Sequence, residues 1–83
     1  MKYRCKCCGY LTLKDPTNGS YEICPVCFWQ NDYVQNNDPS FSGGANEPSL
    51  IEAQHNFLRF GAVEERLIPY VRAPHLDELP ERA

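Results

Sequence analysis

Cys5-Lys6-Cys7-Cys8 and Cys24-Pro25-Val26-Cys27 are two Cys-x-x-Cys pairs in a chain of 83 residues, and fifteen residues separate Cys8 from Cys24. Paired cysteine turns at this spacing are typical of a zinc site. The two-residue spacer lets a tight turn aim both sulfurs at one ion, which four sulfurs hold in a tetrahedron about 2.3 Å away. The sequence therefore predicts one structural Zn²⁺, with Cys5, Cys8, Cys24 and Cys27 as its ligands.

The residues that follow the two cysteine pairs differ. Gly9, after Cys8, can adopt the positive φ that such a turn often needs. Phe28 has the corresponding place after Cys27, where a glycine would be easiest. We therefore expect Phe28 to be strained or the second turn to differ slightly. In either case, Phe28 and Trp29 leave the site towards the core.

Other interpretations of the cysteines stay open. Five cysteines cannot all pair in disulfides, and the start of the chain lacks the apolar run of a secretory signal. We expect a cytoplasmic protein with reduced thiols, and no stretch has the length to cross a membrane. Iron is a minor alternative to zinc, since four thiolates also suit it. Cys7 is a spare thiol, a substitute ligand or a reactive group.

Size and charge restrict the class of protein. A single domain of this size is marginal without a staple such as a metal. The net charge of −3 argues against general nucleic-acid binding. The basic residues Lys2, Arg4, Lys6 and Lys14 precede the first acidic residue. We expect them to offset the negative charge of a four-thiolate centre.

A hairpin is expected to bring the cysteine pairs together. Residues 10–13 alternate like a strand, residues 15–20 are rich in turn formers, and residues 21–23 are predicted to return as the second strand. The long polar stretch 30–48 shows no regular element, and a binding role and a floppy connector are about equally supported for it.

The clearest helix spans residues 49–61. Ser49 is its expected N-cap, with Glu52 completing a capping box, and Gly61 suits its end. Phe57 and Phe60 lie on its apolar face and are expected to pack against the hairpin and Trp29. A short helical turn is predicted from Val63 to Ile68, before Pro69, and the tail from Arg72 is expected to be extended or frayed.

These patterns predict a small α+β metal-stapled domain, a zinc-ribbon or rubredoxin-like β-hairpin with two cysteine knuckles followed by a packed α-helix. The single domain, residues 1–83, divides into a zinc-knuckle hairpin (1–29), a long polar loop (30–48), a helix (49–61) and a short helical turn with a proline-containing tail (62–83). His55 and His75 lack the partners of a catalytic triad, so we do not expect an enzyme.

Several motifs occur together in a specific order: residues 5–10, residues 21–29, Gly43-Gly44-Ala45-Asn46 and residues 56–62. Together they resemble the bacterial cysteine-rich CPCC family over nearly the whole chain. Lys6 stands where the motif that names the family has proline, which loosens the first turn. The resemblance implies that Cys7 and the Gly43–Asn46 segment belong to a shared pattern, and it implies no activity.

The sequence favours a zinc-stapled module that binds another protein. The first alternative is a nucleic-acid-binding zinc ribbon, which rests on analogy of fold and is opposed by the net acidity. The second is a rubredoxin-like redox or electron-transfer protein, for which the cysteine turns and Cys7 are the support.

Overall fold

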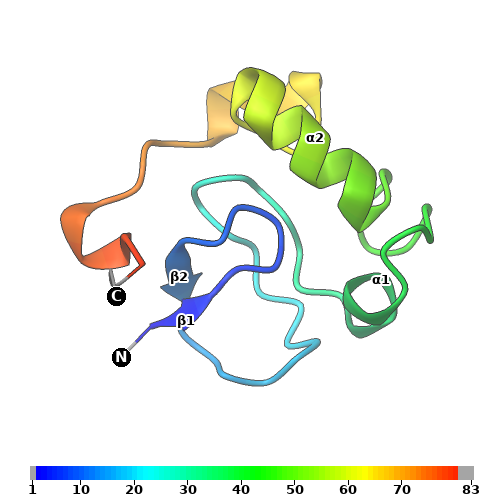
Figure 1. Cartoon of the computed structure of the whole chain (residues 1–83), viewed down its shortest axis with the longest axis horizontal. Helices are drawn as coiled ribbons and strands as arrows, with labels where there is room; N and C mark the ends of the chain where they lie inside the picture. The colour runs from blue at the N-terminus through cyan, green and yellow to red at the C-terminus, as the bar shows by residue number, and fades with distance from the viewer. Residues whose placement is uncertain (1, 81–83) are drawn as a thin grey trace.

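The first cysteine pair lies at the tip of its own two-stranded hairpin. The computed structural model describes residues 2–80. In it, β1 (Tyr3–Arg4) pairs antiparallel with β2 (Leu11–Leu13), with Arg4 opposite Leu11. The second pair lies at the tip of a shorter hairpin that is closed by a bridge between Ile23 and Gln30. Figure 1 shows the two turns at the centre of the molecule, beneath α2.

The predicted pairing of residues 10–13 with residues 21–23 is therefore wrong. The backbone N–H of Cys5 donates to the Tyr10 carbonyl at 2.9 Å, which turns the chain back onto β1 directly after the first cysteine pair. Residues 21–23 are likewise paired with the chain that follows the second cysteine pair. Each cysteine pair thus forms a local hairpin, and the two hairpins meet at their tips.

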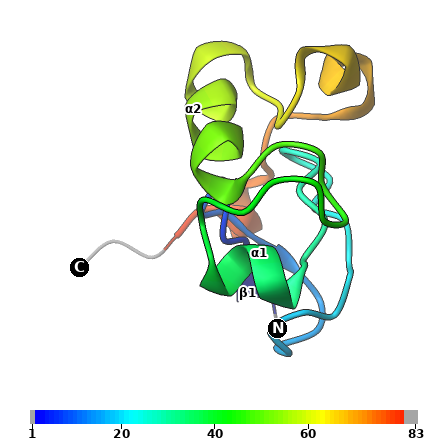
Figure 2. The same ribbon diagram turned by 90° about the vertical axis from the view of Figure 1, so that its right-hand side faces the viewer.

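The polar stretch 30–48 is ordered and contains a helix, contrary to the expectation of no regular element. α1 (Tyr33–Asn37) begins at Asp32, whose side chain accepts from the Gln35 backbone N–H at 3.1 Å. Figure 2 shows α1 and the loop after it packed below α2. A floppy connector is thereby excluded.

A buried amide network holds this stretch together. The Gln35 side chain is fully buried, and its Nε2 lies 3.0 Å from the carbonyl oxygens of both Asn46 and Pro48. The Asn46 side chain accepts from the Gln30 N–H at 2.7 Å and donates to the Gln30 carbonyl at 2.8 Å, as a neighbouring strand would. A Cβ on Gly44 would lie 2.9 Å from side-chain atoms of Gln35 and Asp32, so the close approach requires glycine. The Gly43–Asn46 motif therefore has a structural role, because it closes the polar loop onto Gln30 and Gln35.

α2 (Leu50–Phe60) agrees with the predicted helix. Ser49 and Glu52 form the capping box, with bonds of 3.1 and 2.9 Å, and Gly61 ends the helix at φ 85°. Phe57 and Phe60 are half-buried against the core, and the Phe57 ring meets the Tyr10 ring edge-on at 6.3 Å. Trp29 is 1% exposed, as expected of a core residue.

The chain after α2 is more ordered than predicted. The expected turn before Pro69 is a 3₁₀ helix, η1 (Glu65–Tyr70), that includes Pro69. The tail forms a second 3₁₀ helix, η2 (Leu76–Glu78), instead of staying extended. Glu78 is buried there and pairs with Arg72 through two bonds of 2.8 Å. Residues 81–83, where fraying was expected, lie outside the described part.

The predicted fold class is confirmed: a small α+β domain with an antiparallel hairpin, a packed helix and four clustered cysteines. Within residues 2–80, no helix is both long and apolar enough to cross a membrane.

Candidate metal centre

The sulfurs of Cys5, Cys8, Cys24 and Cys27 come together, as predicted, with every pair within 4.8 Å. Cys5 Sγ lies 3.6 Å from Cys27 Sγ, and Cys8 Sγ lies 3.7 Å from Cys24 Sγ. An ion with four sulfurs about 2.3 Å away requires sulfur–sulfur edges of roughly 3.8 Å. All four cysteines are free thiols, so no disulfide joins them. The donor set therefore fits a tetrahedral metal ion, and the four residues are placed so that they could hold one.

The two cysteine turns have nearly the same backbone geometry. In the first, the Gly9 N–H donates to the Cys5 carbonyl at 3.0 Å; in the second, the Phe28 N–H donates to the Cys24 carbonyl at 2.8 Å. Gly9 has a φ of 81° and Phe28 a φ of 75°. The expectation of strain at Phe28 is confirmed, because this left-handed conformation is easy for glycine and costly for a bulky side chain.

The four thiols cannot all ionise by themselves. Hydrogen bonds from Cys27, and then from Cys5 and Cys8, hold the pKa of Cys24 far below its ordinary value. Their bonds to Cys24 raise the pKa of each of the other three thiols. Ionisation of one of these thiols therefore opposes ionisation of the others. A cation between the sulfurs is what allows all four to be thiolates together.

Thr12 contacts the site and was missed by the sequence reasoning. Its Oγ1 lies 3.0 Å from Cys24 Sγ, and both side chains are buried. A thiolate sulfur has no proton, so when Cys24 is ionised the Thr12 hydroxyl donates to it and helps to lower its pKa. Nothing in the sequence marks Thr12, since a threonine in a strand is ordinary. The Trp29 backbone N–H adds a longer bond, 3.4 Å, to Cys27 Sγ.

The later half of the chain holds both turns in place. From α2, the Gln54 side chain donates to the Lys6 carbonyl at 3.0 Å. After α2, the Val63 N–H donates to the Cys27 carbonyl at 2.9 Å, and the Arg72 N–H donates to the Pro25 carbonyl at 3.2 Å. The two cysteine turns are therefore tied by hydrogen bonds to α2 and to the chain that follows it.

The basic residues near the first turn are only partly used as expected. Arg4 donates to the Gly9 carbonyl at 3.1 Å, beside the first turn. Lys2 instead pairs with Asp77 and Glu78 of the tail, at 3.4 Å each. Lys6 and Lys14 are exposed. The charge of Lys2 therefore serves to dock η2.

Cys7 lies inside the core beside the four ligands. It is 8% exposed and packs in the same apolar cluster as Cys5, Cys24 and Cys27. Val26 has the equivalent position in the second turn and is also buried.

The Phe28 ring lies at the edge of the core and is partly exposed, so the expectation that it would point into the core is only partly met. The ring is half-buried and lies 6.1 Å from the ring of Tyr70, which is 68% exposed. Ile23, Phe28 and Arg66 also line a small hollow of about 100 Å³. We refer to Ile23, Phe28, Arg66 and Tyr70 as the Phe28 face.

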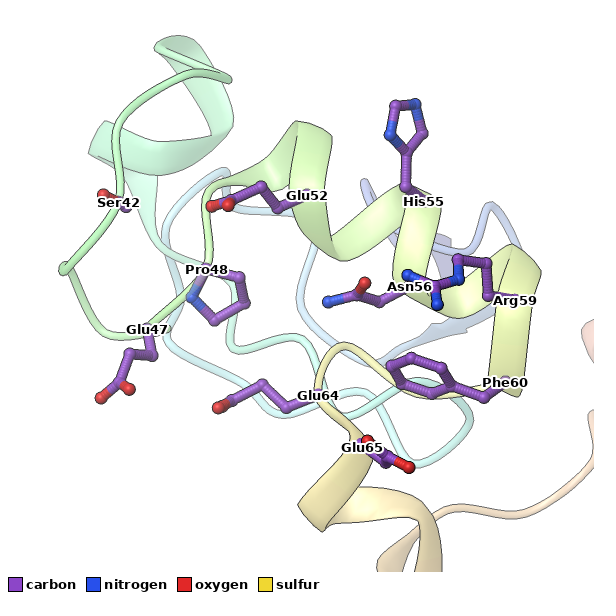
Figure 3. Close-up of a pocket in the computed structure, with 10 residues that line it drawn as sticks. All are labelled: Ser42, Glu47, Pro48, Glu52, His55, Asn56, Arg59, Phe60, Glu64 and Glu65. Carbon is purple, nitrogen blue, oxygen red and sulfur yellow. The ribbon is translucent and has the colours of Figure 1, made fainter.

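A larger open groove, of about 730 Å³, runs along α2 (Figure 3). His55 and Arg59 project from α2, while Glu64 and Glu65 lie on the opposite side. The Glu64 carboxylate is bound by Arg66, at 3.0 Å. His55 is exposed on the helix as predicted, and His75, also exposed, donates its backbone N–H to Glu78. Neither histidine reaches the cysteine site.

Comparison with known proteins agrees with the cysteine pattern. The model of one family, described as cysteine-rich CPCC, matches residues 3–78. No curated protein matches the chain. The match runs from β1 through both cysteine turns, the polar loop and α2 to η2. The chain belongs to the cysteine-rich CPCC family.

Proposed function

We propose that the chain binds one structural Zn²⁺ through Cys5, Cys8, Cys24 and Cys27. Zinc is the usual ion of closed sites with four cysteine ligands. Three of the four sulfurs belong to residues that are at most 1% exposed, which leaves little room for a substrate at the ion. In small domains, the free energy of binding a structural Zn²⁺ contributes directly to the stability of the fold. This role also explains why a chain with so small a core is folded.

On this scaffold, we propose that the chain is a protein-interaction module of the cytoplasm and not an enzyme. The observation that carries the proposal is Phe28, a bulky residue kept in a left-handed conformation where the first turn has glycine. Such strain costs on the order of 1–3 kcal/mol and persists where it serves a role. Five free thiols agree with a reducing compartment.

The Phe28 face has the composition of an interaction surface. Tyr70 and Arg66 are of the residue types that dominate binding energy in interfaces. Ile23 is 45% exposed and borders the same hollow as Phe28, which provides a pocket for an apolar side chain of a partner. Phe28 directly follows the proposed ligand Cys27, so metal binding would fix the backbone from which its ring projects.

A nucleic-acid partner has less support. The net charge is −3, and Lys2 is engaged with two carboxylates of the tail. A protein that binds phosphates needs free basic side chains gathered on one face.

The test is affinity capture with the zinc-loaded chain, followed by reconstitution with each purified partner. Tyr70→Ser removes an exposed ring from the Phe28 face, and Leu58→Ser removes an exposed apolar residue from α2 as the matched control. We expect Tyr70→Ser to weaken binding by about tenfold or more, and the control to leave it unchanged. Equal losses in both variants, or none in Tyr70→Ser, would contradict the assignment of this face.

A further inference from the structure

The four sulfurs of the proposed metal site differ in their exposure to solvent. Cys5 is 1% exposed, and Cys24 and Cys27 are fully buried, whereas Cys8 is partly exposed. A ligand that approaches the site from solvent therefore meets the sulfur of Cys8 before it meets the other three.

The hydrogen bonds to the sulfurs differ in the same direction. Thr12 Oγ1 lies 3.0 Å from Cys24 Sγ, and the Trp29 N–H donates to Cys27 Sγ at 3.4 Å. Among residues 2–80, only Cys24 lies within hydrogen-bonding distance of the Cys8 sulfur. The fourth ligand also has no donor from outside the cysteines, but it is buried. Donors around a metal ligand hold it in place, so Cys8 is the exposed ligand without that support.

The first cysteine turn is also held by fewer bonds than the second. The carbonyls of Pro25 and Cys27 in the second turn each accept a backbone N–H from the chain after α2, and Pro25 has a fixed φ. In the first turn, the Lys6 carbonyl accepts one bond from the Gln54 side chain, and no proline restrains the backbone. Displacement of Cys8 therefore moves the turn with fewer constraints.

Positive charge lies beside Cys8. Lys6 is exposed two residues before it, and the Arg4 guanidinium donates to the carbonyl of Gly9, the residue after it. In the described part of the chain, neither Lys6 nor Arg4 pairs with a carboxylate. Uncompensated positive charge raises the local concentration of anions. The surroundings of Cys8 therefore favour a ligand with negative charge.

We propose that Cys8 is the ligand that an anionic thiol displaces from the metal ion. The proposal rests on the structural zinc proposed above and concerns the exchange of that ion. The incoming group is a thiol because it replaces a thiolate on an ion that binds sulfur well. Its negative charge matches Lys6 and Arg4. A small peptide thiol with free carboxylates has both properties.

The exchange is a substitution in which no electron is transferred. The incoming thiol loses its proton, and its sulfur forms a bond to the ion. The bond between Cys8 and the ion breaks with its electron pair on the Cys8 sulfur, which takes up the proton. Four sulfurs remain around the ion. The displaced first turn then exposes the other ligands to further thiols, which complete the release.

The experiment measures zinc transfer from the loaded full-length chain to a chromogenic chelator, at low ionic strength and at increasing concentrations of glutathione. Cysteamine, a thiol with positive charge, is the control. At equal thiolate concentration, we expect transfer to be about fivefold or more faster with glutathione. Lys6→Gln should slow transfer by glutathione about twofold or more. Lys14→Gln removes the same charge from another exposed lysine and should leave the rate unchanged.

Limited alkylation of the loaded chain with N-ethylmaleimide, followed by peptide mapping, identifies which of the four ligands reacts first. We expect Cys8. First modification of Cys5, Cys24 or Cys27, or a transfer rate that does not depend on glutathione, would overturn the proposal. Equal effects of the two lysine variants would overturn the preference for an anionic thiol. A chain without metal before the reaction refutes the structural zinc itself, whereas a loaded chain that is alkylated elsewhere refutes only the role of Cys8.

Discussion

Replacing Phe28 tests whether the second cysteine turn stores backbone strain. At φ 75°, a residue with a Cβ pays about 1–2 kcal/mol relative to its preferred conformations. Phe28→Gly removes that cost and also removes a half-buried ring that packs against Tyr70. Half of the burial energy of a phenylalanine is roughly 1 kcal/mol. The two effects nearly cancel, so we expect Phe28→Gly to keep its stability to within about 1 kcal/mol.

Phe28→Ala loses the ring without relief of the strain. Glycine normally costs about 0.5–1 kcal/mol more than alanine because the unfolded chain is freer. Here the strain of about 1–2 kcal/mol exceeds that cost, so glycine should be more stable than alanine by about 0.5–1 kcal/mol. This is the reverse of the order found in ordinary helices and strands. Gly9→Ala, at φ 81°, should lose a similar amount and serves as the internal control.

The assay is urea unfolding of the three Phe28 proteins at one fixed zinc concentration, because free ligand shifts apparent stability. With a slope near 1 kcal/mol per molar urea, the expected gap between glycine and alanine is about 0.5–1 M in midpoint. An alanine variant as stable as the glycine variant, or more stable, would refute the argument that Phe28 is strained.

Three further perturbations follow from the hydrogen bonds. Thr12→Val removes the donor to Cys24 and should weaken zinc binding by about tenfold or more, whereas Thr12→Ser should keep it, as chelator competition would measure. Gln35→Leu leaves several backbone groups unpaired and should cost at least about 3 kcal/mol in urea unfolding; a loss below about 1 kcal/mol would contradict the buried network. The bonds from Arg72 lower the pKa of Glu78 to about 2, so this carboxylate adds stability above its ordinary pKa of 4.5 that is lost as pH falls towards 2. The difference in unfolding free energy between the unaltered chain and Glu78→Gln should therefore be constant, at up to about 3 kcal/mol, from pH 6 to 8, and should shrink below pH 4.5. A difference that grows on acidification would contradict a lowered pKa of Glu78 in the folded chain.

The metal ligands could be predicted from the sequence because the Cys-x-x-Cys spacing is a local property of the chain. The same holds for α2, since Ser49, Glu52 and Gly61 mark its ends through contacts within a few residues. Strand pairing is different in kind. The segment at residues 10–13 has the composition of a strand. Its partner is β1 because the hydrogen bond from Cys5 to Tyr10 closes the hairpin directly after the first cysteine pair. The composition of residues 10–13 does not indicate which segment pairs with them.

The polar loop escaped prediction for a second reason. Sequence patterns treat Gln35 and Asn46 as surface residues, because buried amides are rare unless every polar group is paired. Here the pairing is complete, but it joins residues far apart in the chain. The docking of the tail could not be predicted for a similar reason. Arg72 and Glu78 are not at a helical spacing, so their ion pair has no signature in the sequence. Asn46 and Trp29 are both buried, so neither side chain is available to a partner.

The most direct test of the central claim is metal analysis of the purified chain, with native mass spectrometry for stoichiometry and X-ray absorption at the metal edge for its ligands. The account predicts one zinc per chain, bound by four sulfurs at about 2.3 Å. A chain without metal, or one whose four cysteines are joined in disulfides, would contradict it. Iron in the same four-sulfur environment would keep the site and refute the assignment of zinc.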